Sequence, residues 1–314
     1  MSESVVGSTD LSDKSARVAL MSGVDEVPGA AKPDPILTVD KVVRQFGGIT
    51  AVDVGHLEVQ RGIITALIGP NGAGKTTFFN LITGFDKPSS GAAWTFNGQA
   101  INRTSASRVA RAGMVRTFQL TKALNRMTVL DNMMLGAPGQ SGERILTSWL
   151  QPIWSRQERE IREKALGLLD RFKLLEKKDD FAGSLSGGQR KLLEMARSLM
   201  TDPTMIMLDE PMAGVNPALT QSLLGHIEAL RDDGMTVLFV EHDMHVVRHI
   251  SDWVVVMAEG KIVAEGTASS VMAQDAVIDA YLGAHHDTDL GDDSLLEDDQ
   301  FAAIEAEAES EGKS

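Results

Sequence analysis

The chain has 314 residues, of which 43% are hydrophobic, and this length fits one or two globular domains. It contains no cysteine, which excludes disulfide frameworks, thiolate metal sites and cysteine nucleophiles. Most of the formal net charge of −14 lies at the ends: the last thirty residues hold eleven acidic residues and one lysine, whereas residues 36–284 are nearly neutral. This nearly neutral region lacks the clustered lysine and arginine of nucleic-acid-binding proteins, so we expect no nucleic-acid partner.

The first 35 residues mix Ser, Gly, Asp and Glu around three prolines and show no periodicity. Their composition predicts a disordered N-terminal extension over residues 1–35, with a cleaved or regulatory segment as the alternative. They lack the basic start and apolar stretch of a signal peptide. The apolar runs further along the chain have strand length, and they fall short of the ~20 residues that a membrane helix needs.

From residue 36 onward, apolar strands alternate with helical patterns. Strands at 64–68, 205–208 and 237–240 each precede a helix, and these helices are expected to begin at Lys75, Pro217 and Met244. This alternation predicts an α/β fold with a mainly parallel sheet and helices on both faces. Residues 122–202 read as helical almost throughout, which predicts an inserted helical subdomain. Residues 285–314 read as an acidic disordered tail, and the sequence predicts that neither tail is needed for catalysis.

The first of these strands is followed by the phosphate-binding pattern G-x-x-x-x-G-K-[ST], formed by Gly69, Pro70, Asn71, Gly72, Ala73, Gly74, Lys75, Thr76 and Thr77. In such a loop, glycines let the backbone N–H groups wrap a phosphate, and the following helix adds its positive N-terminal end. Lys75 is expected to neutralise β- and γ-phosphate oxygens, and Thr76 to ligate Mg²⁺. The sequence therefore predicts ATP and Mg²⁺ as cofactors.

The strand at 205–208 ends in two carboxylates, Asp209 and Glu210. An Asp-Glu pair after a strand is by itself usually a solvated turn. Beside a phosphate-binding loop, Asp209 is expected to hold Mg²⁺ and Glu210 to orient and deprotonate the attacking water.

A second glycine-containing helix start lies at Leu185-Ser186-Gly187-Gly188-Gln189. Ser186 and the two glycines form another anion cradle. Together with the phosphate-binding loop and the Asp-Glu pair, this pentapeptide makes residues 36–284 resemble the ABC (ATP-binding-cassette) ATPase family. The resemblance implies a P-loop NTPase fold with a RecA-like core, a small antiparallel β subdomain and the inserted helical subdomain. It also implies an ATP sandwiched between two subunits, with Ser186 and Gly188 facing the partner's nucleotide. Ser186, Gly187, Gly188 and Gln189 are the nucleotide-binding residues that the resemblance implies for this segment.

Three further positions match the family pattern. Phe46 falls where an aromatic ring stacks on adenine, with a packed core residue as the alternative interpretation. Gln119 corresponds to the glutamine that senses Mg²⁺ and the attacking water. His242 matches the switch histidine that contacts the γ-phosphate. Asn216 departs from the commonest pattern, which has Asp, and this puts in question only the communication between the two nucleotide sites.

Several stretches resemble one subfamily in particular, the ATPases of branched-chain (hydrophobic) amino acid importers. The stretches are 45–52, 113–119, 127–132, 213–217, 260–267 and 280–283. The resemblance implies an ATPase that couples ATP hydrolysis to transmembrane transport at the cytoplasmic face of the membrane. Implied partners are a second, related ATPase in a heterodimer, two membrane permeases and an extracytoplasmic solute-binding protein. Urea or amide importers, lipopolysaccharide-type export complexes and non-transport ABC ATPases are the alternatives.

The span from Ser141 to Trp154 is unusually apolar for an inserted loop. One interpretation places it in the core of the helical subdomain. The other, suggested by the family resemblance, makes it a contact for a cytoplasmic helix of the permease.

Overall fold

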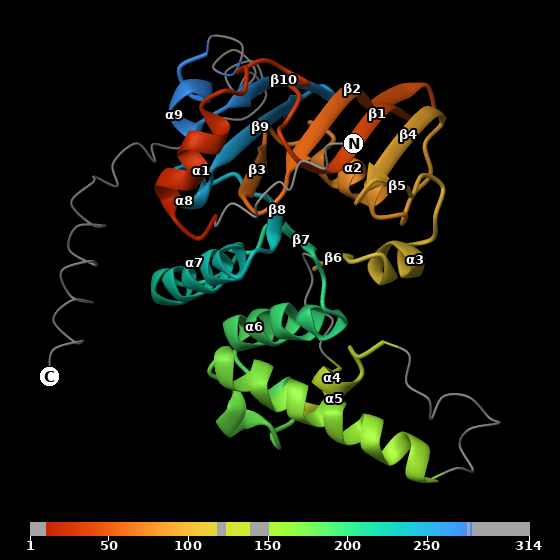
Figure 1. Cartoon of the computed structure of the whole chain (residues 1–314), viewed down its shortest axis with the longest axis vertical. Coiled ribbons are helices and arrows are strands. Elements are labelled where there is room, and N and C mark those ends of the chain that lie inside the picture. Colours follow the sequence, from red (N-terminus) through yellow and green to blue (C-terminus); the bar gives the residue numbers. More distant parts are fainter. Residues whose placement is uncertain (1–10, 118–123, 139–150, 275–276, 278–314) are drawn as a thin grey trace, which may run out of the picture.

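The computed structural model describes residues 11–117, 124–138, 151–274 and 277. Two sheets lie in its upper part and a group of helices in its lower part (Figure 1). The first sheet is antiparallel, with strand order β2-β1-β4-β5. Its strands are β1 (Pro35–Phe46), β2 (Ile49–Gln60), β4 (Ser90–Phe96) and β5 (Gln99–Ala100).

The second sheet has the order β10-β9-β3-β8-β7-β6, and only β10 pairs in the antiparallel sense. Its strands are β3 (Ile64–Ile68), β6 (Met114–Arg116), β7 (Met205–Asp209), β8 (Thr236–Val240), β9 (Trp253–Ala258) and β10 (Lys261–Gly266). Strands β3, β7 and β8 are buried at every position, because helices or the other sheet cover both faces. This arrangement confirms the predicted α/β class.

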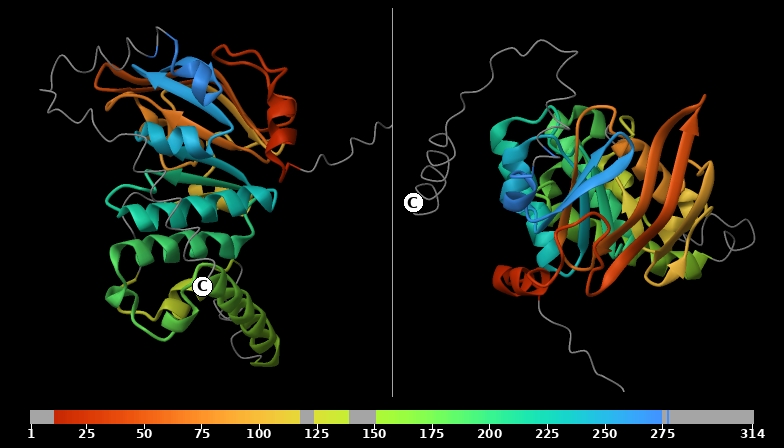
Figure 2. Two further views of the ribbon diagram at one scale, coloured as in Figure 1. Left: turned by 90° about the vertical axis from the view of Figure 1, so that its left-hand side faces the viewer. Right: turned by 90° about the horizontal axis from the view of Figure 1, so that it is seen from above.

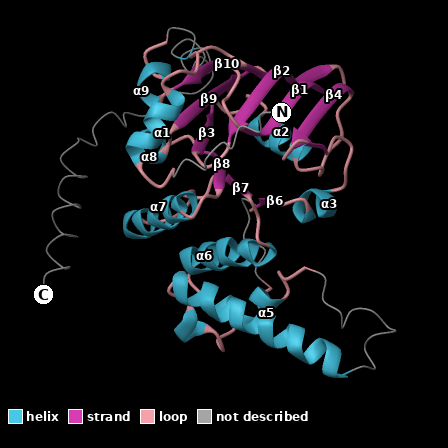
Figure 3. Cartoon of the chain, in the orientation of Figure 1, coloured by secondary structure: helices cyan, strands magenta, loops and turns pink. Residues whose placement is uncertain are grey.

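The two faces of the parallel sheet pack against different partners. Leu67 and Met207 point into a core shared with the antiparallel sheet and helix α2 (Lys75–Ile82). Their neighbours Ala66 and Leu208 point into a second core. That core contains α4 (Val129–Met134), α5 (Gln151–Arg171), α6 (Gly187–Ser198), α7 (Pro217–Asp232), α8 (Met244–Ile250) and α9 (Ala268–Val271). Figure 3 shows α2 near the strands of the two sheets and α6 and α7 below them.

Every regular element that the structure describes between residues 124 and 202 is helical. Besides α4, α5 and α6, the stretch holds the short 3-10 helices η2 (Leu175–Lys177), η3 (Ala182–Ser184) and η4 (Leu199–Thr201). In the left view of Figure 2, these helices extend away from the two sheets. Helix α3 (Ala106–Arg111) precedes β6 in the sheet part. Among the described residues, no helix combines the length and the apolar character that crossing a membrane requires.

The expectation of disorder over residues 1–35 is wrong for residues 11–35. Helix α1 (Lys14–Met21) forms there, capped by the side chain of Asp13. Buried Arg17 donates from Nε to Asp252 Oδ1 at 2.8 Å, so the helix is tied to the start of β9. The composition gave no hint of this, because the partner carboxylate lies 235 residues away. Residues 1–10 and the predicted tail at 285–314 lie outside the described residues.

A second ion pair fixes the end of the same segment. Lys32 Nζ lies 2.8 Å from Glu265 Oε2, and both side chains are almost fully buried. Glu265 also accepts hydrogen bonds from the backbone N–H of Gly29 and the indole N–H of Trp253. Residues 11–34 lead into β1 and are held by these two ion pairs, one to Asp252 before β9 and one to Glu265 in β10. We name them the N-terminal strap.

Candidate functional site

The parallel sheet brings the predicted motifs together at one edge. The phosphate-binding loop follows β3, Glu241 and His242 follow β8, and Asp209 and Glu210 stand at the end of β7. These three strands are adjacent and parallel, so their carboxyl ends meet, which is where α/β sheets bind ligands. Gln119 follows β6, the next strand, but it lies outside the described residues, as do residues 141–150 of the apolar span from Ser141 to Trp154.

The phosphate-binding loop needs glycine at two positions for a steric reason. A side chain on Gly69, whose φ is 146°, would meet the carbonyl oxygen of Met257 at 1.9 Å. One on Gly74, whose φ is 96°, would meet the carbonyl oxygen of Ala51 at 2.3 Å. Gly74 is also the N-terminal cap of α2, so the strained turn delivers the helix start to the loop. Asn71, Gly72 and Thr76 are exposed at its open side.

Lys75 lies across the mouth of the loop. Its Nζ donates to the carbonyl oxygens of Gly69 at 2.6 Å and Pro70 at 2.9 Å. Burial lowers the pKa of Lys75, while the nearby carboxylates of Glu210 and Asp209 act in the opposite direction. Both carboxylates stand at the end of β7, at the same sheet edge as the phosphate-binding loop.

Asp209 is held by a residue to which the sequence analysis gave no role. Arg116 at the end of β6 donates from Nη2 to Asp209 Oδ2 at 2.5 Å and from Nη1 to Asn80 Oδ1 at 2.6 Å. Both partners of the Arg116–Asp209 ion pair are almost fully buried. Arg116 therefore joins Asp209 to α2, the helix that begins at the phosphate-binding loop.

Glu210 and His242 occupy neighbouring strand ends with different exposure. Glu210 is half-buried and has a left-handed backbone with φ of 46°, which is uncommon for a residue with a side chain. The side chain of His242 is 65% exposed, and its Nδ1 lies 3.9 Å from Oε2 of buried Glu241. The exposed imidazole is free to approach a ligand at the sheet edge.

The Leu185–Gln189 segment starts α6 with a reciprocal cap. The backbone N–H of Gln189 donates to Ser186 Oγ at 3.2 Å, and that of Ser186 donates to Gln189 Oε1 at 3.0 Å. Gly188 faces α7, where an added Cβ would lie 1.4 Å from Leu219 Cδ2. Ser186 and Gly187 are exposed. Ser186 and Gly187 are therefore open to solvent, whereas Gly188 packs against α7, which does not fit the expectation that Gly188 faces a partner. Helix α6 lies below α2, the helix that the phosphate-binding loop opens (Figure 1).

Phe46 stands at the end of β1 with 47% of its surface exposed, so it is not the packed core residue of the alternative interpretation. The guanidinium of Arg44 lies 4.2 Å from its ring centroid, and Arg44 Nε donates to Asp86 at 2.9 Å. The ring is supported on one side and open to solvent elsewhere, as a base-stacking residue requires.

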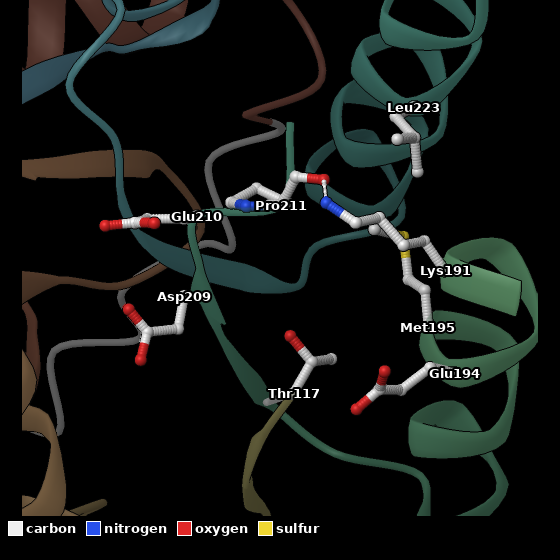
Figure 4. Close-up of a pocket in the computed structure, with 8 residues that line it drawn as sticks. All are labelled: Thr117, Lys191, Glu194, Met195, Asp209, Glu210, Pro211 and Leu223. Atoms are coloured by element: carbon white, nitrogen blue, oxygen red, sulfur yellow. Dashed lines mark hydrogen bonds between the residues drawn. The ribbon is translucent and has the colours of Figure 1, made fainter. Parts of the chain in front are cut away.

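A small pocket lies between α6 and the segment that follows β7, and Figure 4 shows its lining. Lys191 and Glu210 both line it. Burial lowers the pKa of Lys191, while the nearby carboxylates of Glu241, Glu194 and Glu210 act to raise it. Burial raises the pKa of Glu241, although the backbone N–H of Met212 donates to its carboxylate. Neither Lys191 nor Glu241 stands in a phosphate-binding pattern, so no local signal in the sequence predicts a role for them.

Comparison with known proteins agrees with this geometry. Residues 52–213 match the family model described as ABC transporter, and residues 261–287 match that of the branched-chain amino acid ATP-binding cassette transporter. A probable branched-chain amino acid transport ATP-binding protein, LivG of Archaeoglobus fulgidus, is 41% identical over 79% of this chain and 96% of its own length. The high-affinity branched-chain amino acid transport ATP-binding protein BraF of Pseudomonas aeruginosa is 40% identical, with 98% of its length covered.

A solved structure shares the same fold. The nucleotide-free ATP-binding cassette of an ABC transporter has 38% identity and a TM-score of 0.69, covering 79% of this chain and 98% of its own. An ATP-binding cassette of an ABC transporter in its ADP conformation has 39% identity and the same TM-score. The chain is therefore a nucleotide-binding ATPase that belongs to the ABC transporter family of ATP-binding proteins, in the subfamily it shares with LivG and BraF.

Proposed function

We propose that this chain powers the import of branched-chain amino acids through a membrane permease pair. The observation that carries the proposal is the placement of Lys75, Asp209, Glu210 and His242 at one sheet edge, in a chain whose relatives carry branched-chain amino acid transport in their names. The site would lie at the cytoplasmic face of the membrane. Transport assays with different solutes distinguish this function from import of urea or amides and from export of lipopolysaccharide.

The site residues divide the work of ATP hydrolysis. Phe46 would stack on adenine, the loop from Gly69 to Thr77 would hold the phosphates, and Lys75 would neutralise their charge. Glu210 would take the proton of the attacking water, and His242 and Gln119 would orient the reacting groups. Developing negative charge on the γ-phosphate is then stabilised by Lys75 and the loop N–H groups.

Thr76 and Asp209 fit a Mg²⁺ site. Both offer oxygen ligands, the type that Mg²⁺ prefers, and Arg116 fixes the Asp209 carboxylate. The described residues include no group of three or more His, Cys, Asp or Glu side chains that would hold a metal alone. Mg²⁺ in nucleotide sites commonly takes phosphate oxygens among its ligands, so nucleotide phosphates would complete the site, and the ion would supply charge neutralisation when bound.

The working assembly would contain a second, related ATPase, two permeases and an extracytoplasmic solute-binding protein. Purifying this chain with its complex from membranes and identifying the other chains by mass spectrometry tests this composition. A permease pair together with a different ATPase would support it. Recovery of this chain without any permease would contradict it.

Pairing with a different ATPase predicts an asymmetric effect of Ser186→Arg. Ser186 is exposed at the start of α6, so a bulky cation there should block only the site whose phosphate-binding loop belongs to the partner. The site that holds Lys75 keeps its own loop. Trapping nucleotide in the assembled transporter and counting occupied sites checks this: one site lost supports a heterodimer, and two sites lost would mean that the chain pairs with itself.

A further inference from the structure

The turn that carries Glu210 has a strained backbone. Glu210 adopts a φ of 46°, and the left-handed region is unfavourable for a residue with a side chain. Its N–H donates to Val240 O at 3.0 Å, and its carbonyl accepts from the N–H of Ala213 at 3.2 Å. Such a conformation persists only where neighbouring groups hold it, so the contacts of residues 211–213 decide where the Glu210 carboxylate lies.

Lys191 holds this turn from the side of α6. Its Nζ donates to the carbonyl oxygens of Pro211 at 2.8 Å and Ala213 at 2.5 Å. Figure 4 shows the lysine reaching from α6 to Pro211, while the Glu210 side chain extends to the other side of the turn. A charged donor bonded to two carbonyls in a part-buried site is a strong contact.

Glu241 holds the residue between those two carbonyls. Its Oε1 accepts from the backbone N–H of Met212 at 2.9 Å, in a buried position. Its Oε2 accepts from the N–H of His242 at 3.3 Å. Three consecutive residues, 211, 212 and 213, are thus fixed alternately by a lysine on α6 and a glutamate at the end of β8.

We propose that Lys191 is a positioning residue for Glu210, with Glu241 as its opposing anchor. The proposal rests on the proposed function, in which Glu210 is the base. Lys191 lies five residues after Ser186 and two after Gln189, in α6. The turn that carries this chain's own carboxylate is therefore bonded directly to the helix whose start, in the proposed function, faces the partner's nucleotide. A shift of α6 is transmitted to Glu210 through the Lys191 bonds.

Lys191→Met in the complex purified from membranes tests the proposal. Methionine keeps most of the side-chain volume and removes both bonds to the turn. We expect kcat for phosphate release to fall about tenfold to a hundredfold, since misplacing a catalytic group by about 1 Å has effects of this size. KM and fluorescent-nucleotide affinity should stay within about twofold, because no contact to nucleotide is removed. Lys191→Arg keeps a charged donor and should recover most of the lost rate.

Lys164→Met is the matched control. Lys164 also donates to a backbone carbonyl, that of Met200 at 2.8 Å, but far from the turn. The complex carrying Lys164→Met should keep a normal kcat for phosphate release. An unchanged kcat in Lys191→Met, or an equal loss in Lys164→Met, would overturn the positioning role. Glu210→Gln separates the two hypotheses: normal hydrolysis by that variant would remove the proposed base, whereas an inactive Glu210→Gln beside a fully active Lys191→Met would refute only the present inference.

Discussion

Glu210→Gln is expected to bind nucleotide normally and to lose steady turnover by a factor of about 10² to 10⁴, the usual contribution of a general base. The amide keeps the size of the side chain but cannot take a proton from water. The contacts of Lys75 with Gly69 and Pro70 do not involve Glu210, so the phosphate-binding loop stays intact. Phosphate release beside a fluorescent-nucleotide titration measures both effects.

Lys75→Ala is the contrasting variant. It removes the charge from the phosphate-binding loop, so nucleotide affinity itself should fall. We expect slow turnover with normal nucleotide affinity in Glu210→Gln and weak nucleotide affinity in Lys75→Ala. This contrast would assign Glu210 to the hydrolysis step and Lys75 to nucleotide binding. Normal steady hydrolysis by Glu210→Gln would remove the assignment of the base.

Among the variants named here, Lys32→Met is expected to lower the free energy of unfolding most. It leaves the carboxylate of Glu265, which is fully buried, without its ion-pair partner, and breaking such a pair costs about 3 to 5 kcal/mol. The loss should first release the N-terminal strap, because the strap supplies no strand to either sheet. Limited proteolysis within residues 11–34 and a thermal melt of the full chain measure the two events.

Two further variants control this prediction. Lys14→Met changes an exposed lysine of the same strap and should alter stability by less than about 0.5 kcal/mol. Adding Glu265→Gln to Lys32→Met removes the stranded charge and should recover part of the loss. If the strap of Lys32→Met resists proteolysis as well as the unchanged chain does, the ion pair does not hold it.

Local patterns were enough to place the elements that carry the site. The starts predicted for the helices at Lys75, Pro217 and Met244 agree with α2, α7 and α8, because a glycine turn, a proline at the first helical position and an Asp cap are all visible in the sequence. The parallel order of the strands then brings Lys75, Asp209 and His242 to one edge. The helix starts depend on neighbours within a few residues, whereas the strand order joins segments far apart in the sequence.

Ion pairs between residues far apart in the chain could not be predicted from the sequence. Arg17 meets Asp252, Lys32 meets Glu265 and Arg116 meets Asp209, each across a large separation that no local pattern encodes. The strap therefore read as disordered from its composition. Asn216 shows a smaller difference: its side chain caps α7 by accepting from the N–H of Leu219, so the residue has a local task besides any role between subunits.

Transport in proteoliposomes tests the central claim most directly. The purified complex is reconstituted with ATP enclosed, and the solute-binding protein and radiolabelled leucine are added outside. We predict that leucine accumulates in an ATP-dependent manner with the unchanged chain and that the complex carrying Glu210→Gln accumulates none. Vesicles that hydrolyse ATP yet accumulate urea or an amide instead of leucine, isoleucine or valine would contradict the account.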